Sequence, residues 1–407
     1  MRWRAGCRRG ATLDRAGVLA QAATLTAEAK TGKLRGPLHG IPVGVKDEFH
    51  VAGMPTYFTG SAQPQPEDAT AVAKLRAAGA IIVGKTHMPI DGVLPPTRNP
   101  WNLAHTAGGT SSGSGAAVGA RMTPFALGEQ TSGSNLRPAA YCGVAALKPT
   151  YGRISRFGMY PFAWSHDHAG LIGLTMADIA LVFSVIAGPD PRDHTARPEP
   201  APPPMQDVAG MRPPRIGVVG NFFPERTEPV MQAAIEHSAQ RLKAAGAAVV
   251  DVLLPDDFAT IWMAHRVISS VEGLTLRARR YGEDAPPAMT ARDAAASLLP
   301  GTYYLQAQRI RHHFWTRLQA MFANVDTLLM AVAPGAAPEG IQSTGDPVLL
   351  IPWSCVGYPA ITVNGGLSPA GLPLGLQLVA PPMADERLMR IGAWCEQVLG
   401  RLPAPPI

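Results

Sequence analysis

Four groups of residues in this sequence could take part in chemistry. They are Lys46, the glycine-, serine- and threonine-rich stretch 106–115, the turn 129–134, and the triplet His166-Asp167-His168. A serine or threonine hydroxyl becomes a nucleophile when a base removes its proton, and a histidine or an uncharged lysine can be that base. Histidine and aspartate are also metal ligands. Two kinds of site are therefore open, a hydroxyl nucleophile with its base or a metal centre.

The stretch 106–115 has a composition that is common in flexible linkers. Here, however, apolar segments lie on both sides of it, at 116–120 and at 124–128. The segment 116–120 is predicted to be helical. We therefore expect an ordered loop inside the fold rather than a linker between two domains.

The triplet 166–168 makes a poor zinc site, because no third ligand stands at a recognisable spacing. It could instead join Ser134 in a Ser-His-Asp arrangement, and that alternative stays open at this stage. Cys142 is another possible nucleophile, but it has no local partner in the sequence. We expect it to be a small buried side chain.

Composition excludes several classes of protein. The chain is 46% apolar and 16% charged, whereas soluble domains average ~25% charged, so a mainly disordered protein is excluded. No apolar run approaches the ~20 residues that span a bilayer. The four cysteines contain no Cys-x-x-Cys pair, which fits a reducing compartment, and we expect the cytoplasm.

The net charge of +6 does not indicate nucleic-acid binding. Residues 1–15 hold five arginines and one aspartate, a local charge of +4, so the rest of the chain carries only +2. A nucleic-acid surface would instead spread its lysines and arginines over a folded face. We expect residues 1–15 to be disordered.

Helical and strand patterns alternate along the chain. Strand-like apolar runs lie at 41–45, 80–85, 215–219, 247–254 and 327–332, and helical patterns at 16–31, 68–78, 228–245 and 256–323. The order strand, helix, strand across 215–254 predicts a crossover with parallel strands, and the runs 359–363 and 374–379 predict a hairpin. The proline-rich stretch 189–214 is expected to be an exposed connection. This alternation is typical of an α/β fold.

Several segments resemble motifs of the amidase signature family, and they occur in the family's order. They are Gly36-Pro-Leu-His-Gly-Ile-Pro-Val-Gly-Val-Lys46-Asp and the stretches 108–144, 147–153 and 371–379. The resemblance implies one domain, residues 16–407, with a large twisted mixed β-sheet that helices cover on both faces. The connection 189–214 would join its two sequence halves on the surface.

The resemblance also implies a triad of lysine, a serine preceded by a cis peptide bond, and a nucleophilic serine. These positions correspond to Lys46, Thr110 and Ser134, and Thr110 stands where the family usually has serine. Backbone N–H groups of Thr131, Ser132, Gly133 and Ser134 would stabilise the oxyanion, and Ser111, Ser114 and Asp167 would support the site.

This assignment sets a physical condition on the lysine. An unperturbed lysine has a pKa near ~10.4, so Lys46 can act as a base only if burial holds it uncharged. Thr110 keeps the hydroxyl that can relay a proton from Ser134 to Lys46, although its extra methyl restricts χ1.

We expect hydrolysis of a linear carboxamide through an acyl-enzyme on Ser134, with release of ammonia or an amine. No metal or organic cofactor is implied. The alternatives are the glutaminase (A) subunit of a tRNA-dependent amidotransferase, or an inactive scaffold, which Thr110 suggests. We expect a small-molecule amide as partner, no direct contact with nucleic acid or membrane, and a surface that allows a homodimer.

Overall fold

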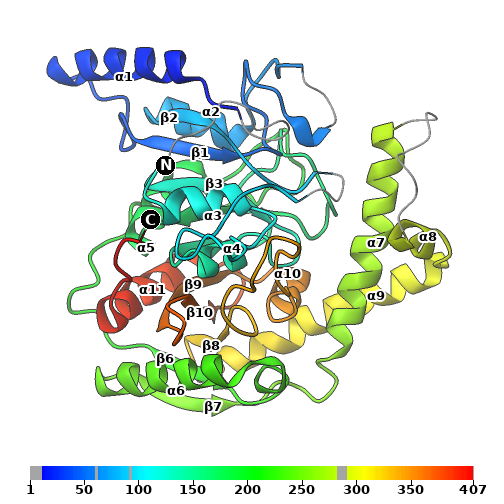
Figure 1. Cartoon of the computed structure of the whole chain (residues 1–407). Helices are drawn as coiled ribbons and strands as arrows, with labels where there is room; N and C mark the ends of the chain where they lie inside the picture. The colour runs from blue at the N-terminus through cyan, green and yellow to red at the C-terminus, as the bar shows by residue number, and fades with distance from the viewer. Residues whose placement is uncertain (1–11, 60–62, 91–93, 282–290, 407) are drawn as a thin grey trace.

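The computed structural model describes residues 12–59, 63–90, 94–281 and 291–406 (Figure 1). Within them, one ten-stranded mixed sheet has the order β2-β1-β3-β5-β4-β9-β10-β8-β6-β7. The strands are β1 (Pro42–Lys46), β2 (Ile81–Thr86), β3 (Phe125–Gln130), β4 (Ala145–Lys148), β5 (His168–Gly173), β6 (Arg215–Val219), β7 (Ala248–Val252), β8 (Thr327–Ala331), β9 (Ala360–Leu367) and β10 (Pro373–Val379).

Helices precede, connect and follow these strands. They are α1 (Arg15–Lys30), α2 (Thr70–Ala77), α3 (Ser112–Gly119), α4 (Leu136–Tyr141), α5 (Met176–Ile186), α6 (Pro229–Ala244), α7 (Thr260–Tyr281), α8 (Ala291–Ser297), α9 (Gly301–Arg317), α10 (Ile351–Val356) and α11 (Asp385–Leu399), with 3₁₀ turns η1 (Tyr57–Thr59), η2 (Pro224–Arg226) and η3 (Leu318–Ala323). None of the described helices combines the length and apolar character that crossing a membrane requires.

Helices cover the sheet on both faces, as the sequence predicts. On β9, the side chain of Ile361 contacts α11 at Gly392, whereas the hydroxyl of the next residue, Thr362, lies on the side where β10 meets Ala140 of α4. Successive residues of a strand point to opposite faces, so α11 and α4 lie on opposite sides. Helices α2, α5, α11 and α6 contact one another in series, and α3 packs on α4 across the sheet from them.

The site depends on the parallel part of this sheet. Strand β1 lies between β2 and β3 and runs parallel to both, with Lys46 in register with Thr86 and Val45 in register with Leu127. Its residues after Pro42 are all buried, which explains the uninterrupted apolar run in the sequence. The carboxyl ends of β1, β2 and β3 therefore meet at one edge of the sheet.

Most of the predicted elements are present. The pair β6 and β7 is parallel across α6, and β9 and β10 form an antiparallel hairpin, as predicted. Residues 106–115 are not wholly a loop, because α3 already begins at Ser112. Gly115 allows this, since a Cβ there would lie 2.9 Å from the carbonyl oxygen of Pro138 in α4. Small residues thus let the helix dock closely.

Two predicted segments lie at the borders of the description. Of residues 1–15, those numbered 1–11 lie outside the described residues. Thr12 accepts a hydrogen bond from the backbone of Lys85, and Asp14 caps α1 through Gly17 N. The stretch 189–214 contains no helix or strand and joins α5 to β6.

Candidate active site

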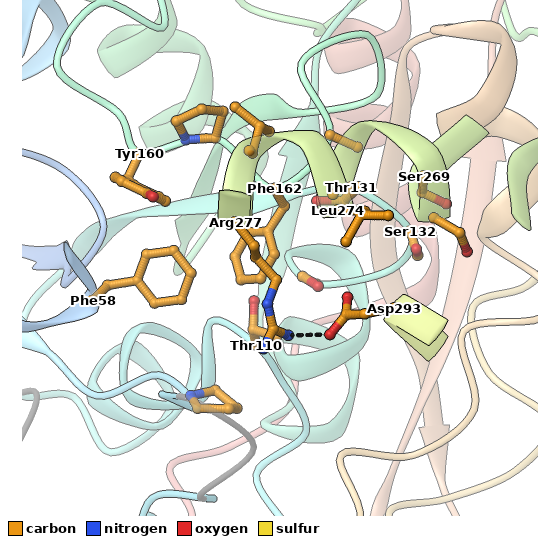
Figure 2. A pocket seen from close by; sticks show the side chains of 17 residues that line it. Phe58, Thr110, Thr131, Ser132, Tyr160, Phe162, Ser269, Leu274, Arg277 and Asp293 are labelled. Atoms are coloured by element: carbon orange, nitrogen blue, oxygen red, sulfur yellow. Dashed lines mark ion pairs between the residues drawn. The ribbon is translucent and has the colours of Figure 1, made fainter. Parts of the chain in front are cut away.

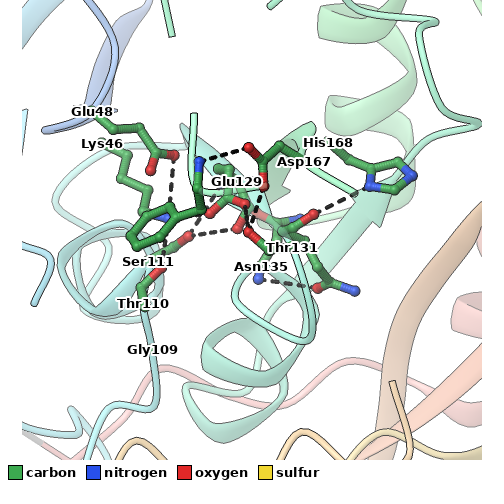
Figure 3. Close-up of polar contacts among 12 residues, drawn as sticks. Lys46, Glu48, Gly109, Thr110, Ser111, Glu129, Thr131, Asn135, Asp167 and His168 are labelled. Carbon is green, nitrogen blue, oxygen red and sulfur yellow. Dashed lines mark hydrogen bonds and ion pairs between the residues drawn. The ribbon is translucent and has the colours of Figure 1, made fainter. Parts of the chain in front are cut away.

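Lys46 ends β1 and points into a buried cluster of polar side chains (Figure 3). Its Nζ lies 2.7 Å from Thr110 Oγ1, 2.8 Å from Glu129 Oε2 and 3.3 Å from Glu48 Oε1. The side chain of Lys46 has no solvent exposure, and neither has that of Glu48. Glu129 reaches the lysine because it lies at the end of the neighbouring parallel strand, β3.

The expectation that burial leaves Lys46 uncharged is wrong. Burial by itself would lower the pKa of Lys46, but the negative charges of Glu129 and Glu48 outweigh it and raise the pKa above its ordinary value. At neutral pH the resting lysine is an ammonium ion. Sequence analysis did not identify either glutamate as part of the site, although each lies next to a segment that it singled out.

A third carboxyl group, that of Asp167, lies behind Glu129. The Thr131 hydroxyl lies 2.7 Å from Glu129 Oε1 and 2.7 Å from Asp167 Oδ1. Burial, reinforced by the charge of Glu129, raises the pKa of Asp167 to about 7. Burial also raises the pKa of Glu48 well above its usual range. Near neutral pH this cluster therefore holds protons that exposed carboxyl groups would have lost.

The predicted loop brings Thr110 to the lysine. The peptide bond between Gly109 and Thr110 is cis, and the buried Arg137 donates a hydrogen bond of 2.7 Å from Nη2 to the carbonyl oxygen of Gly109. The next residue, Ser111, donates from its backbone N–H to the carbonyl oxygen of Ser134 (3.0 Å). Ser114 bonds Thr86 and the carbonyl of Leu127, and so fixes α3 to the strands. The loop and the turn 129–134 are thus joined directly.

The turn after β3 is held open by its own side chains and by distant elements. Gln130 Oε1 accepts from the backbone N–H groups of Asn135 (3.1 Å) and Leu136 (2.9 Å). A Cβ on Gly133 would lie 2.8 Å from Leu350 Cδ1, so only glycine allows this turn to approach the segment before α10. His265 of α7 contacts the Thr131 carbonyl oxygen (3.2 Å). Neither Gln130 nor His265 is recognisable as a site residue from the sequence.

The four backbone N–H groups expected at the oxyanion position are available. Across the described residues, none of the hydrogen bonds is donated by the backbone N–H of Thr131, Ser132, Gly133 or Ser134. Ser134 and Thr110 both line the cavity next to this turn. Their hydroxyls make no hydrogen bond with each other in the described structure, and Thr110 Oγ1 bonds Lys46 instead. The structure thus joins Lys46 to Thr110 but leaves Ser134 free.

The competing groups lie elsewhere. His168 is buried and contacts the backbone carbonyl oxygens of Gln130 and His166 through Nδ1, so it makes no Ser-His-Asp arrangement with Ser134. Asp167 instead accepts from the backbone N–H groups of Phe162 and Ala163. Burial raises the pKa of the Cys142 thiol, which makes it a poor nucleophile. The described residues contain no cluster suited to a metal ion.

A cavity of about 330 Å³ opens beside Thr110 and Ser134 (Figure 2). Phe58, Tyr160 and Phe162 form an aromatic wall, in which the Phe58 ring centre lies 5.3 Å from that of Tyr160 and 4.7 Å from that of Phe162. Helix α7 supplies a second wall with Ser269, Ser270, Gly273, Leu274, Leu276 and Arg277. Arg277 pairs with Asp293 of α8 at 3.2 Å.

Three comparisons relate the chain to known proteins. The family model described as Amidase matches residues 9–389. The chain is 36% identical to the (A) subunit of the glutamyl-tRNA(Gln) amidotransferase of Anaeromyxobacter sp. (strain K), over 97% of this chain and 89% of that protein.

Solved structures give the same relation. The native peptide amidase from Stenotrophomonas maltophilia superposes with a TM-score of 0.82 and 29% identity, over 97% of this chain and 89% of that one. The (A) subunit of the glutamyl-tRNA(Gln) amidotransferase from Thermotoga maritima superposes with a TM-score of 0.81 and 26% identity, over 95% of this chain and 94% of that one.

Proposed function

The chain belongs to the amidase family and is an amidohydrolase, and from this premise we propose that it hydrolyses a linear carboxamide through an acyl-enzyme on Ser134. The observation that carries the proposal is the contact of Lys46 with Thr110 at 2.7 Å beside a turn that also carries Ser134. Ammonia or an amine leaves in the first half of the reaction. Water releases the acid in the second.

The proposed proton route runs from Ser134 through Thr110 to Lys46. Thr110 Oγ1 already bonds Lys46, and the Ser134 hydroxyl opens on the same cavity. Hydrogen bonds of this kind often shorten only when substrate is bound. The serine oxygen then attacks the amide carbon while its proton moves to Thr110 and the Thr110 proton moves to the lysine nitrogen.

The negative charge on the substrate oxygen would be stabilised by the free N–H groups of the turn 131–134. Such donors are effective because they are already oriented when the charge develops. Gly133 keeps the turn close to the segment before α10, and His265 holds the Thr131 carbonyl away from the cavity side. These contacts orient the donors before the substrate arrives.

The cavity wall suggests which acyl group is accepted. Phe58, Tyr160 and Phe162 present an aromatic surface, and Leu274 faces the same space from α7. Apolar surface of this kind favours an apolar or aromatic acyl group, because its burial releases ordered water. We therefore propose amides such as 3-phenylpropanamide as better substrates than acetamide.

A second candidate function is the glutaminase subunit of a tRNA-dependent amidotransferase. Curated relatives with that function are 34–36% identical to this chain, and the chain covers 86% and 89% of two of them. In this case glutamine would be the amide and a partner chain would receive the ammonia. The reaction at Ser134 would be the same.

A panel of amides with ammonia detection tests the proposal. The purified chain should release ammonia from 3-phenylpropanamide, and Ser134→Ala should lose this activity while keeping the fold. If glutamine is hydrolysed far better than the other amides, the glutaminase function is favoured. If wild type and Thr110→Ser are both inactive on every amide, the chain is the inactive scaffold.

A further inference from the structure

Lys46 cannot accept a proton in the state that the structure describes. An ammonium group has three N–H donors and no acceptor. Lys46 Nζ has three oxygen partners within 3.3 Å, namely Thr110 Oγ1, Glu129 Oε2 and Glu48 Oε1. A proton must therefore leave the lysine before one can arrive from Thr110.

Glu129 is in the best position to receive that proton. Its Oε2 lies 2.8 Å from Lys46 Nζ, half an ångström closer than Glu48, and its side chain is 1% exposed. Water has little access to this contact. The proton therefore has a short route to a carboxylate and a poor one to solvent.

The contact of Thr131 with two carboxyl groups supports a proton within this cluster. A hydroxyl has one proton to donate, yet Thr131 Oγ1 lies 2.7 Å from Glu129 Oε1 and also 2.7 Å from Asp167 Oδ1. Both contacts are hydrogen bonds only if one of the two carboxyl groups is protonated and donates to the threonine oxygen. The geometry thus fits one proton shared by Glu129 and Asp167.

We propose that Glu129 takes up the proton of Lys46, so that the base of this site is a lysine–glutamate pair rather than a lysine alone. The inference rests on the proposed function, because it concerns the same reaction. Glu129 acts through Lys46 and touches no substrate. It is therefore a positioning residue that sets the protonation state of the lysine.

The protons balance over one half-reaction. One N–H bond of Lys46 breaks as an O–H bond forms at Glu129 Oε2, and rotation about Cε–Nζ turns the lysine lone pair to Thr110. The Ser134 proton moves to Thr110 Oγ1 as the Thr110 proton moves to Lys46, and a C–O bond forms at the amide carbon. The leaving nitrogen then takes a proton from Lys46 through Thr110, and Glu129 returns its proton to the lysine.

The charged groups around Lys46 allow a clear pH test. Glu48 faces it from the segment after β1, Glu129 faces it from β3, and Asp167 lies behind Glu129. From β2, Lys85 approaches Asp47 at 3.4 Å rather than Lys46. The loop before α3 contributes the uncharged Thr110. Because proton transfer inside the pair leaves the total charge unchanged, it needs no loss of a proton to solvent.

The test is the pH dependence of kcat/KM for 3-phenylpropanamide. We expect the wild type to show a plateau between pH 7 and 9. A lysine that acted alone, with its pKa raised above 10.5, would instead give a rate that climbs about tenfold per pH unit over this range. Glu129→Gln should remove the plateau, lower kcat/KM at pH 7 by at least ~100-fold, and recover activity as the pH rises.

Two variants separate this role from a structural one. Glu48→Gln removes the more distant carboxylate on the same lysine and should keep the plateau. Glu129→Asp keeps a carboxylate and should regain part of the rate that Glu129→Gln loses, even if Glu129→Gln folds poorly.

The results that contradict the proposal are distinct from those that contradict the proposed function. A plateau that survives in Glu129→Gln, or one lost in Glu48→Gln instead, overturns the proton-acceptor role of Glu129. A wild-type rate that climbs across pH 7 to 9 also overturns it, while Ser134-dependent hydrolysis still stands. A wild type without hydrolysis of any amide overturns both.

Discussion

The two sides of the cavity are built in different ways. The side that carries Lys46, Glu129 and Ser134 is formed by the ends of buried parallel strands and the turn that follows them. The opposite side is formed by helix α7 and by Asp293 of α8, in a part of the chain with no strand between Val252 and Thr327 among the described residues. Strand ends fix atoms to fractions of an ångström, whereas a helix can change its side chains without moving the sheet.

This difference suggests a division of labour. Substitutions on the strand side should change the rate for every amide, because they alter the proton route or the nucleophile. Substitutions on the helix side should change which amide is accepted. The predictions below test this division, from the largest expected effect to the smallest.

Replacement of Lys46 should have the largest effect on the proton route. Lys46→Arg keeps a positive charge beside Glu129 and Glu48, but arginine stays protonated and cannot act as a base. We expect kcat/KM to fall by ~10⁴-fold or more for all amides, without recovery at high pH. Lys46→Met is a weaker test, because it leaves two buried carboxylates without their partner, at a cost of about 3–5 kcal/mol in stability.

Both lysine variants need a check of folding. Thermal unfolding of Lys46→Arg should stay close to that of the wild type, and Lys46→Met should unfold at a lower temperature. Residual activity of Lys46→Arg within tenfold of the wild type is incompatible with a base at this position.

Replacement of Thr110 should have the next largest effect. Thr110→Val keeps the shape of the side chain but removes the hydroxyl, so Ser134 loses its route to Lys46. We expect a loss of ~10²–10⁴-fold in kcat for all amides. Thr110→Ser keeps the hydroxyl and removes the extra methyl, and its activity should equal or exceed that of the wild type. If Thr110→Val is fully active, Ser111 or another group carries the proton.

A change in α7 should have a smaller and selective effect. Gly273 lines the cavity within a helix, and a Cβ there would lie 3.4 Å from the carbonyl oxygen of Phe162, an ordinary contact. Gly273→Leu should therefore fold and fill part of the cavity. We expect kcat/KM for 3-phenylpropanamide to fall about tenfold, while that for acetamide stays within about threefold, because one pocket contact contributes about this much to discrimination.

Gly301→Ala is the matched control, since it also lies in a helix and has open space around its Cβ position. It should change neither rate. An equal fall for both amides in Gly273→Leu would contradict the assignment of selectivity to α7.

The sequence predicted the strand side of the cavity better than the helix side. Apolar runs placed Lys46 at the end of a strand, and family motifs placed Thr110 and Ser134. Sequence reasoning missed Glu48 and Glu129 because a glutamate is usually a solvated surface residue, and only the parallel register brings Glu129 to the lysine. Their charges reversed the predicted protonation of Lys46.

The helix side was beyond such reasoning for a different reason. The tract 256–323 was predicted to be helical, and α7, α8 and α9 lie there. Helical periodicity, however, does not say which face of α7 meets the aromatic wall across a distance of more than 100 residues. Gly273 and His265 gain their meaning only from contacts with residues 131 and 162.

The central claim is that Ser134 is the nucleophile, and covalent labelling tests it most directly. A fluorophosphonate probe reacts with a serine whose proton can be removed, and mass spectrometry of the digested protein locates the label. We predict one label on the wild type, at Ser134, none on Ser134→Ala, and slow labelling of Lys46→Arg. A label at another residue, together with amide hydrolysis that survives in Ser134→Ala, would contradict the account.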